Sequence, residues 1–298
     1  MSDFFSSGWH WFIAVLSVGG LAFCIWLLFA SAKTTDMSSD GTTGHVWDDD
    51  LREMNNPLPR WWLGLFVITV VFSAIYLFLY PGLGQVEGSL KWSSDGQYQD
   101  EMAKAQAKTA PLYQRLAAMD APALAADAEA MGIGQRLFLN NCAQCHGSDA
   151  KGSKGFPNLS DNDWLWGGDF AAIKHSITEG RVGQMPPMAA AVGSAEDQRN
   201  LAHYVLSLSG SAHDNLRAQL GKEKFAACAA CHGAKGEGNT ALGAPNLSDK
   251  VWLHGWGEPA ILAMIQNGKH NEMPAQKNAL PPEQIHVLAA YVWSLSNR

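Results

Sequence analysis

Two short stretches decide the fold of this sequence: CAQCH at residues 142–146 and CAACH at residues 228–232. Both have the form C-x-x-C-H, which is the attachment signature of c-type haem. Two thiols three positions apart lie on one helical turn and reach the two vinyl groups of one porphyrin, and the histidine that follows faces the iron. A lone C-x-x-C also occurs in thioredoxin-like and zinc sites, so two copies followed by histidine are the more specific signal.

An internal repeat extends beyond these motifs. The segment PNLSD at residues 157–161 recurs 88 residues later at 245–249, and at the same offset Met185-Pro186 falls on Met273-Pro274. A thioether is a soft ligand for haem iron, and His/Met ligation raises the reduction potential. The coincidence with the repeat predicts a methionine as the sixth iron ligand in each copy. Met188 has no counterpart in the second copy and is interpreted as a packing residue.

The sequence therefore predicts two covalently bound c-type haems and no catalytic site. We assign covalent attachment to Cys142, Cys145, Cys228 and Cys231, and axial iron ligation to His146, Met185, His232 and Met273. The simplest pairing of axial ligands stays within each copy, His146 with Met185 and His232 with Met273. Crosswise pairing between the copies is the alternative, and both remain open.

The chain on either side of the haem motifs is also repeated. A glycine and a phenylalanine precede each motif, and each copy ends in a similar aromatic helix. The matched positions are Gly134 and Gly221, Phe138 and Phe225, and the ends at 204–209 and 291–296. These residues resemble class I cytochrome c domains, whose first and last helices cross around one haem. The resemblance implies an all-α fold with two such domains in tandem, at residues 131–210 and 211–298.

Two long apolar runs occupy the N-terminal third. Residues 11–30 and 61–80 contain no Asp, Glu, Lys, Arg or His. Twenty helical residues reach about 30 Å, the thickness of the hydrocarbon core of a bilayer. We predict two transmembrane helices, within residues 1–30 and 61–81. A cleaved signal peptide is the alternative for the first run, because Ala30-Ser31-Ala32 has the form of a cleavage site, although residues 1–10 hold no Lys or Arg.

Lysine and arginine positions orient these spans. The loop at residues 31–60 carries Lys33, Arg52 and Arg60, whereas the N-terminal tail has none, so the positive-inside rule places the loop in the cytoplasm. Both chain ends then lie outside. In bacteria c-type haem is attached outside the cytoplasmic membrane, which agrees with this orientation. We therefore expect a bacterial inner-membrane protein with its haem domains in the periplasm.

Residues 82–130 are predicted to be an acidic, Ala-rich tether between the membrane and the haem domains. Residues 97–108 are good helix formers, and Pro111 is expected to interrupt that helix. The whole chain of 298 residues has a formal charge of -7, which argues against nucleic-acid binding. The acidity lies outside the haem domains, because residues 131–298 hold 14 basic and 14 acidic side chains. Local patches and haem propionates are therefore expected to steer redox partners.

The order of these parts resembles the dihaem subunit III of cbb3-type cytochrome c oxidases. The resemblance covers nearly the full chain, including the loop sequence at residues 55–62 that leads into the second span. It implies an electron-transfer subunit that takes electrons from a soluble periplasmic cytochrome c and relays them towards a haem-copper catalytic subunit. A monohaem cytochrome c subunit and membrane lipid are the other implied partners.

Two further functions are weighed against this one. The chain could be the cytochrome subunit of a periplasmic dehydrogenase or a freestanding membrane cytochrome, which copurifying subunits would reveal. It could instead be a dihaem peroxidase. Peroxide chemistry requires an open iron position, whereas a methionine in each copy predicts that both irons are six-coordinate.

Overall fold

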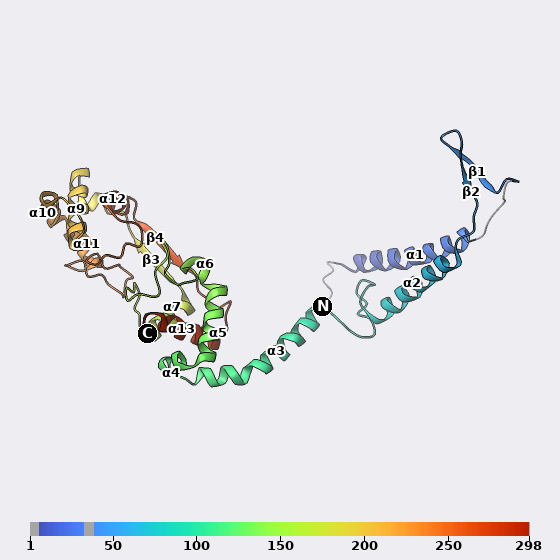
Figure 1. The fold of residues 1–298 in the computed structure, drawn as a ribbon, viewed down its shortest axis with the longest axis horizontal. Coiled ribbons are helices and arrows are strands. Elements are labelled where there is room, and N and C mark those ends of the chain that lie inside the picture. Colours follow the sequence, from blue (N-terminus) through green and yellow to red (C-terminus); the bar gives the residue numbers. More distant parts are fainter. Residues whose placement is uncertain (1–5, 33–38, 298) are drawn as a thin grey trace. The chain divides into compact units, whose positions relative to one another are not determined.

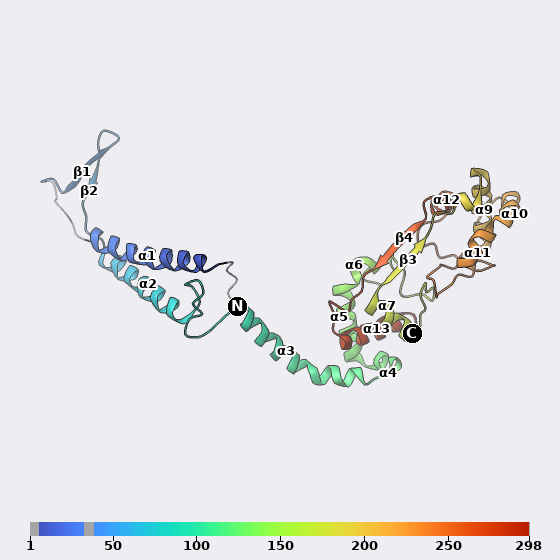
Figure 2. The same cartoon turned by 180° about the vertical axis from the view of Figure 1, so that it is seen from behind.

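The computed structural model describes residues 6–32 and 39–297 (Figure 1). Lys33 and the first five residues, on which the predicted orientation partly depends, lie outside the described residues. The chain divides into two compact units, Met1–Lys108 and Thr109–Arg298. Both units are built mainly from helices, as the view from behind also shows (Figure 2).

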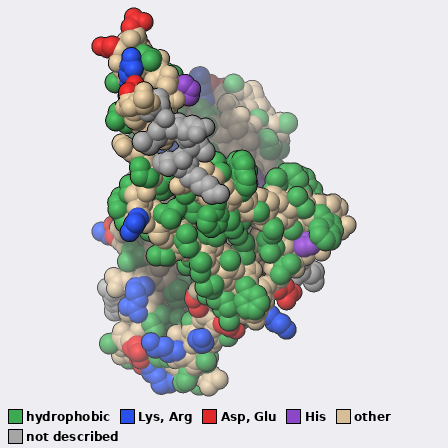
Figure 3. Space-filling view, turned by 90° about the vertical axis from the view of Figure 1, so that its right-hand side faces the viewer, with side chains coloured by type: hydrophobic (Ala, Val, Ile, Leu, Met, Phe, Trp, Pro, Cys, Tyr) green, Lys and Arg blue, Asp and Glu red, His purple; other side chains and the backbone are tan. Residues whose placement is uncertain are grey.

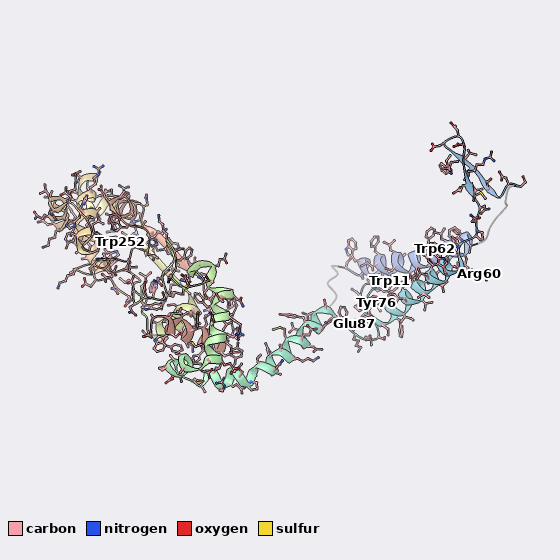
Figure 4. The ribbon with its side chains drawn as sticks, viewed as in Figure 1. Trp11, Arg60, Trp62, Tyr76, Glu87 and Trp252 are labelled. Atoms are coloured by element: carbon pink, nitrogen blue, oxygen red, sulfur yellow. The ribbon has the colours of Figure 1, made fainter. Side chains whose placement is uncertain are left out.

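The first unit contains the two predicted membrane helices. Helix α1 spans Ser7–Ser31 and helix α2 spans Arg60–Leu79, with mean hydropathies of 2.5 and 2.4 over their most apolar windows. They pack side by side, yet most of their large apolar side chains are exposed. Figure 3 shows the resulting hydrophobic surface, and Figure 4 labels Trp11 and Trp62 on these helices. By length and composition both helices suit a lipid environment.

A β-hairpin that the sequence analysis missed lies between these helices. Strand β1, Thr42–Trp47, pairs antiparallel with strand β2, Leu51–Met54. The turn contains Asp48 and Asp49, which both adopt positive φ, as a tight turn of this kind requires. Because the strands are short and every residue after Thr42 is exposed, no alternation of buried and exposed side chains revealed them.

The stretch predicted as a tether is more ordered than expected. Helix α3 runs over Ser94–Ala117 and includes Pro111, so the expected interruption there is wrong. Helix α4 follows at Ala121–Ala126. Leu116 and Leu124 are fully buried against the end of the chain, in a cluster that includes Val287 and Ala290. The latter part of the predicted tether therefore belongs to the core of the second unit.

The second unit carries both haem motifs. Its remaining elements are α5 (Ala128–Asn141), α6 (Ala143–His146), α7 (Phe170–Glu179), β3 (Arg181–Met185), α8 (Ala189–Val192), α9 (Ala195–Leu208), α10 (Asn215–Gly221), the 3-10 helix η1 (Glu223–Phe225), α11 (Ala226–His232), α12 (Glu258–Asn267), β4 (Lys269–Met273) and α13 (Pro282–Ser296). Strands β3 and β4 form an antiparallel pair, so with the hairpin the described residues contain two small sheets, and the helix-rich fold is not purely α.

Two hydrophobic cores divide this unit into lobes. The first lobe comprises α4 to α7 and α13, and its core centres on Phe138, Ile173 and Leu288. The second lobe comprises α8 to α12 with η1, and its core centres on Leu201 and Phe225. These lobes do not follow the repeat boundaries of 131–210 and 211–298. Helix α9 of the first repeat packs in the second lobe, and α13 of the second repeat packs in the first.

Candidate functional site

Each haem motif forms one short helical segment that gathers its two thiols and its imidazole. Cys142 is the N-cap of α6, and the helix ends at Gly147, whose φ of 77° is open to glycine without strain. The second motif closes α11 in the same way, with Gly233 at φ 81°. In both copies the first thiol is half-buried and the second is exposed. This arrangement presents both sulfurs on one helical turn, as attachment to a single porphyrin requires.

The two motif histidines are oriented by identical hydrogen bonds. His146 Nδ1 lies 3.0 Å from the carbonyl oxygen of Pro157, and His232 Nδ1 lies 2.9 Å from that of Pro245. Since a carbonyl oxygen only accepts, Nδ1 carries the proton and Nε2 keeps its lone pair. Both side chains are about nine-tenths buried. Each imidazole is thereby held in the tautomer and orientation that an iron ligand needs.

The PNLSD segments explain how those carbonyls are placed. Asn158 Oδ1 accepts hydrogen bonds from Ser160 N at 2.9 Å and Ser160 Oγ at 2.7 Å. Asn246 and Ser248 repeat this turn at 2.9 and 2.6 Å. The sequence showed that the segment was repeated, but its role as the histidine-orienting loop became visible only in three dimensions.

The cysteine thiols do not have the properties of reactive nucleophiles. Burial raises the pKa of the Cys142 thiol to about 11, and the neighbouring Cys145 adds to the shift. Burial and Cys231 likewise raise the pKa of Cys228. Thioredoxin-like chemistry requires the opposite shift. A zinc site needs converging His, Cys or acidic ligands, and no group of three such side chains gathers anywhere in the described ranges 6–32 and 39–297.

The surroundings of each motif fit a covalently attached haem. Leu159 and Trp164 pack against the first core beside Cys142, and their repeat counterparts Leu247 and Trp252 pack against the second core beside Cys228. Trp252 is labelled within the second lobe in Figure 4. Apolar walls, two sulfurs and one oriented imidazole together match the demands of a c-type haem.

The predicted axial methionines lie at the ends of the paired strands. Met273, at the end of β4, packs against the first core together with Cys142. Met185, at the end of β3, pairs with Lys269, the residue that begins β4 after α12 of the second lobe. The structure therefore brings Met273 to the lobe of His146, and it brings Met185 to the lobe of His232. Met188 also packs against the second core.

The two copies differ where the lobes meet. The guanidinium of Arg181 lies 4.9 Å from the ring centroid of Trp166, a cation–π contact. In the second repeat the position equivalent to Trp166 is His254, 88 residues later. The Nε2 atom of His254 lies 3.0 Å from Asn271 Nδ2. Burial, followed by the charges of Lys269 and Lys154, lowers the pKa of His254. The aligned repeats show that Trp166 is replaced by His254, but the different contacts of these two side chains are visible only in the structure.

Comparisons with known proteins identify the family of this chain. Residues 129–205 and 217–292 match the family described as cytochrome c oxidase, cbb3-type, subunit III. Residues 39–87 match the N-terminal domain of cytochrome oxidase-cbb3, FixP. The cbb3-type cytochrome c oxidase subunit CcoP of Rubrivivax gelatinosus is 60% identical over 296 residues, which cover 99% of this chain and 97% of that protein. This chain belongs to the CcoP/FixP family of cbb3-type oxidase subunits.

More distant members of the family match nearly as much of their own length. The subunit FixP of Rhizobium meliloti is 38% identical over 87% of this chain and 96% of its own. The subunit CcoP of Cereibacter sphaeroides is 36% identical over 85% and 94%. As a CcoP/FixP member the chain is a cytochrome c electron-transfer component of a cbb3-type oxidase and not its catalytic subunit. The dehydrogenase and peroxidase alternatives are not favoured.

Proposed function

We propose that this CcoP/FixP subunit carries two c-type haems, one on each of two class I cytochrome c repeats at residues 131–210 and 211–298. Cys142 and Cys145 would attach the first haem, and Cys228 and Cys231 the second. His146 and His232 would ligate the irons on one side, and Met185 and Met273 on the other. The observation that carries this proposal is the repeated hydrogen bond from each histidine Nδ1 to a proline carbonyl, which leaves Nε2 free for iron.

In the proposed mechanism the chain holds two redox centres and changes little during transfer. Bound haem supplies an iron that cycles between the ferric and ferrous states. The buried imidazoles, oriented by Pro157 and Pro245, keep their geometry in both states because their second nitrogen is fixed. The apolar residues around each motif exclude water, which tunes the potential and limits reorganisation. No residue of the chain is proposed to carry out oxygen chemistry.

We propose that the haem repeats lie in the periplasm of a bacterium and that α1 and α2 cross the inner membrane. Arg52 lies between the two helices and Arg60 is the first residue of α2, as the positive-inside rule expects of a cytoplasmic loop and its flank. Trp11 and Trp62 lie near the ends of the helices, where aromatic side chains favour the headgroup region. The apolar surfaces of the two helices would contact lipid or neighbouring subunits.

The proposed partners follow from the family. A haem-copper catalytic subunit would accept the electrons, a monohaem cytochrome c subunit would share the complex, and a soluble periplasmic cytochrome c would act as donor. The haem repeats hold equal numbers of basic and acidic residues, so docking would depend on local patches rather than on net charge.

Subunit and haem analysis of the detergent-purified complex tests this function. We expect two covalent haems on this chain beside b-type haem and copper on a larger subunit. Copurification with a dehydrogenase and no copper would contradict the oxidase assignment. A high-spin ferric haem in this chain together with peroxide turnover would indicate a peroxidase instead.

A further inference from the structure

The space around Trp166 in the first repeat is filled by the protein itself. The ring of Trp166 lies so close to Gly243, in a loop of the second repeat, that an added Cβ at Gly243 would overlap it. The Arg181 guanidinium covers the same ring, 4.9 Å from its centroid. Because a glycine, an indole and a guanidinium pack together here, the first repeat has no room for a ligand at this position.

The equivalent position in the second repeat is a pocket. His254 stands where the first repeat has Trp166, and its smaller ring lines a cavity of about 390 Å³. Cavities of about 300 Å³ or more are typical of small-ligand sites. The side chains that line this cavity are those of Lys154, His254, Ala260, Ala263, Met264 and Lys269. The pocket therefore combines a loop of the first repeat with α12 and β4 of the second.

This pocket is separate from the core that surrounds the second haem motif. Ile261 packs in that core with Cys228, whereas Met264, from the same helix α12, lines the pocket. A backbone hydrogen bond from Gly155 N to Leu253 O, at 2.7 Å, joins the two repeats next to the pocket. The pocket thus belongs to the junction between the repeats, and backbone contacts hold its walls in place.

The charged groups around the pocket are all cationic. Lys154 and Lys269 line it, and no Asp or Glu is among the lining residues. Neither ammonium forms an ion pair with a carboxylate within the described ranges 6–32 and 39–297. Burial, followed by the charges of Lys269 and Lys154, lowers the pKa of His254, so both ammonium groups act on one imidazole. A positive cluster without a counter-charge attracts anions.

The corresponding cation of the first repeat is held by other side chains. Arg181 is the counterpart of Lys269, and its Nε donates to Ser176 Oγ at 2.8 Å. Met264 replaces Ser176 in the second repeat, and a thioether is only a weak acceptor. At these positions the second repeat has neither the hydroxyl nor the indole that hold Arg181. The Lys269 ammonium is therefore available to a ligand.

His254 adds a directed donor to the two ammonium groups. Its Nε2 lies 3.0 Å from Asn271 Nδ2. Since an amide nitrogen only donates, Nε2 accepts this hydrogen bond, and Nδ1 of the neutral ring carries the proton. Two ammonium groups and one imidazole N–H are donors suited to the oxygen atoms of an anion.

We propose that this pocket binds an anionic oxygen group, a phosphate or a carboxylate, through Lys154, Lys269 and His254. Two sources share this chemistry: an oxyanion dissolved in the surrounding medium and a propionate of a bound haem. The pocket itself depends only on side chains of this chain, whereas the propionate source also rests on the proposed haem attachment. The first repeat, with Trp166 at the equivalent position, is not expected to bind an anion there.

Equilibrium dialysis against radiolabelled inorganic phosphate tests the dissolved source on the full chain in its purified complex, with ionic strength held constant by chloride. Lys154→Gln removes one ammonium and should weaken the binding of one phosphate by about tenfold or more. His254→Trp introduces the ring that fills the first repeat and should abolish this binding. Lys250→Gln, which changes an exposed lysine of the same repeat outside the pocket, is the matched control and should leave it unchanged.

Resonance Raman spectra of the same variants test the propionate source. The bending modes of haem carboxylates shift when the hydrogen bonds to them change. If a propionate occupies the pocket, phosphate binding is the same in all variants. Lys154→Gln then shifts a propionate mode that Lys250→Gln leaves in place. The two measurements therefore distinguish the two sources of the anionic group.

The proposal is overturned if Lys154→Gln and His254→Trp change neither phosphate binding nor a propionate mode. That result, obtained with two covalent haems on the chain, would leave the proposed function intact. A chain without covalent haem would contradict the proposed function, and phosphate binding would still test the pocket. Because Lys154 is exposed, its substitution keeps the test available if His254→Trp does not accumulate.

Discussion

The two lobes of the second unit share one proposed haem-binding scheme but differ in the packing that supports it. Both orient a buried histidine through a proline carbonyl and close on a glycine-mediated helix crossing. The first lobe has an additional cluster, in which Leu116 and Leu124 cover α5 and α13. Arg115 at the end of α3 adds ion pairs to Asp127 and Glu129, both at 2.6 Å. The local sequence of each motif thus supplies the same proposed haem ligands, whereas the packing around the motifs differs between the two lobes.

Removing the phenylalanine at each crossing should have the largest effect on stability. Phe138→Ala and Phe225→Ala delete matched, buried aromatic rings, and each should cost about 3–5 kcal/mol of unfolding free energy. Because the helices are exchanged, Phe138→Ala should raise amide hydrogen exchange in α13, and Phe225→Ala should raise it in α9. Hydrogen exchange followed by mass spectrometry measures both. Increased exchange of α9 in the Phe138 variant instead would contradict the exchanged packing.

The two long apolar helices could be predicted from the sequence, because each depends on a continuous apolar run. The assignment of the methionines as iron ligands, which depends on the repeat spacing, stays a prediction. The sequence could not predict which last helix crosses which first helix. Tyr204 and Tyr291 lie in nearly identical segments, so either helix fits against Gly134 or Gly221 equally well by pattern. Chain connectivity and the β3–β4 pair determine which last helix crosses which first helix. The five-residue strands themselves lack the alternation of apolar and polar residues that would have revealed them.

Replacing the two crossing glycines, Gly134 and Gly221, with alanine should lower the stability by unequal amounts. Gly221→Ala forces a Cβ against the backbone of Asn200, whereas Gly134→Ala meets the Tyr291 side chain. Overpacking of this kind costs about 1–3 kcal/mol, and backbone has less freedom to move than a side chain, so Gly221→Ala should be the more harmful. Thermal unfolding of the two variants tests the order. Gly132→Ala, whose nearest neighbour is the end of the Arg136 side chain, is the control. Equal losses at all three positions would show that the crossings are not tight.

Exchanging Trp166 and His254, which distinguish the two copies, should change the unfolding free energy less than the glycine substitutions do. Trp166→His removes the cation–π contact with Arg181 and should cost about 0.5–2 kcal/mol. The reciprocal His254→Trp places an aromatic ring near Lys269 and loses the contact with Asn271. Chemical denaturation measures both changes. Trp166→Phe, which retains a weaker aromatic face, should lose less than Trp166→His, and an equal loss would exclude the cation–π contact as the cause.

The smallest expected effect depends on pH. Burial, followed by the charges of Asp249 and Asp161, raises the pKa of Asp163 to about 6, above its value of about 3.9 in an unfolded chain. The ionised form is therefore disfavoured in the folded state, and stability is lost as pH rises from about 4 to about 6. Asp163→Asn should gain stability over wild type across this window and hold that gain at higher pH.

Unfolding curves recorded at several pH values measure the difference between Asp163→Asn and wild type. Asp249→Asn, a substitution in the other repeat, should reduce this pH dependence in part, because it removes one of the charges acting on Asp163. If the difference in unfolding free energy between Asp163→Asn and wild type did not vary with pH, Asp163 would not be the source of the pH dependence.

The central claim is that each lobe holds one haem between a histidine and a methionine. Redox titration of the purified full chain, as wild type and with Met185→His or Met273→His, tests it most directly. We predict that covalent haem content stays the same and that each substitution lowers one midpoint, by on the order of 0.1 V or more within the span of about 0.8 V that axial ligands control. Two midpoints that remain unchanged in both variants would contradict the account.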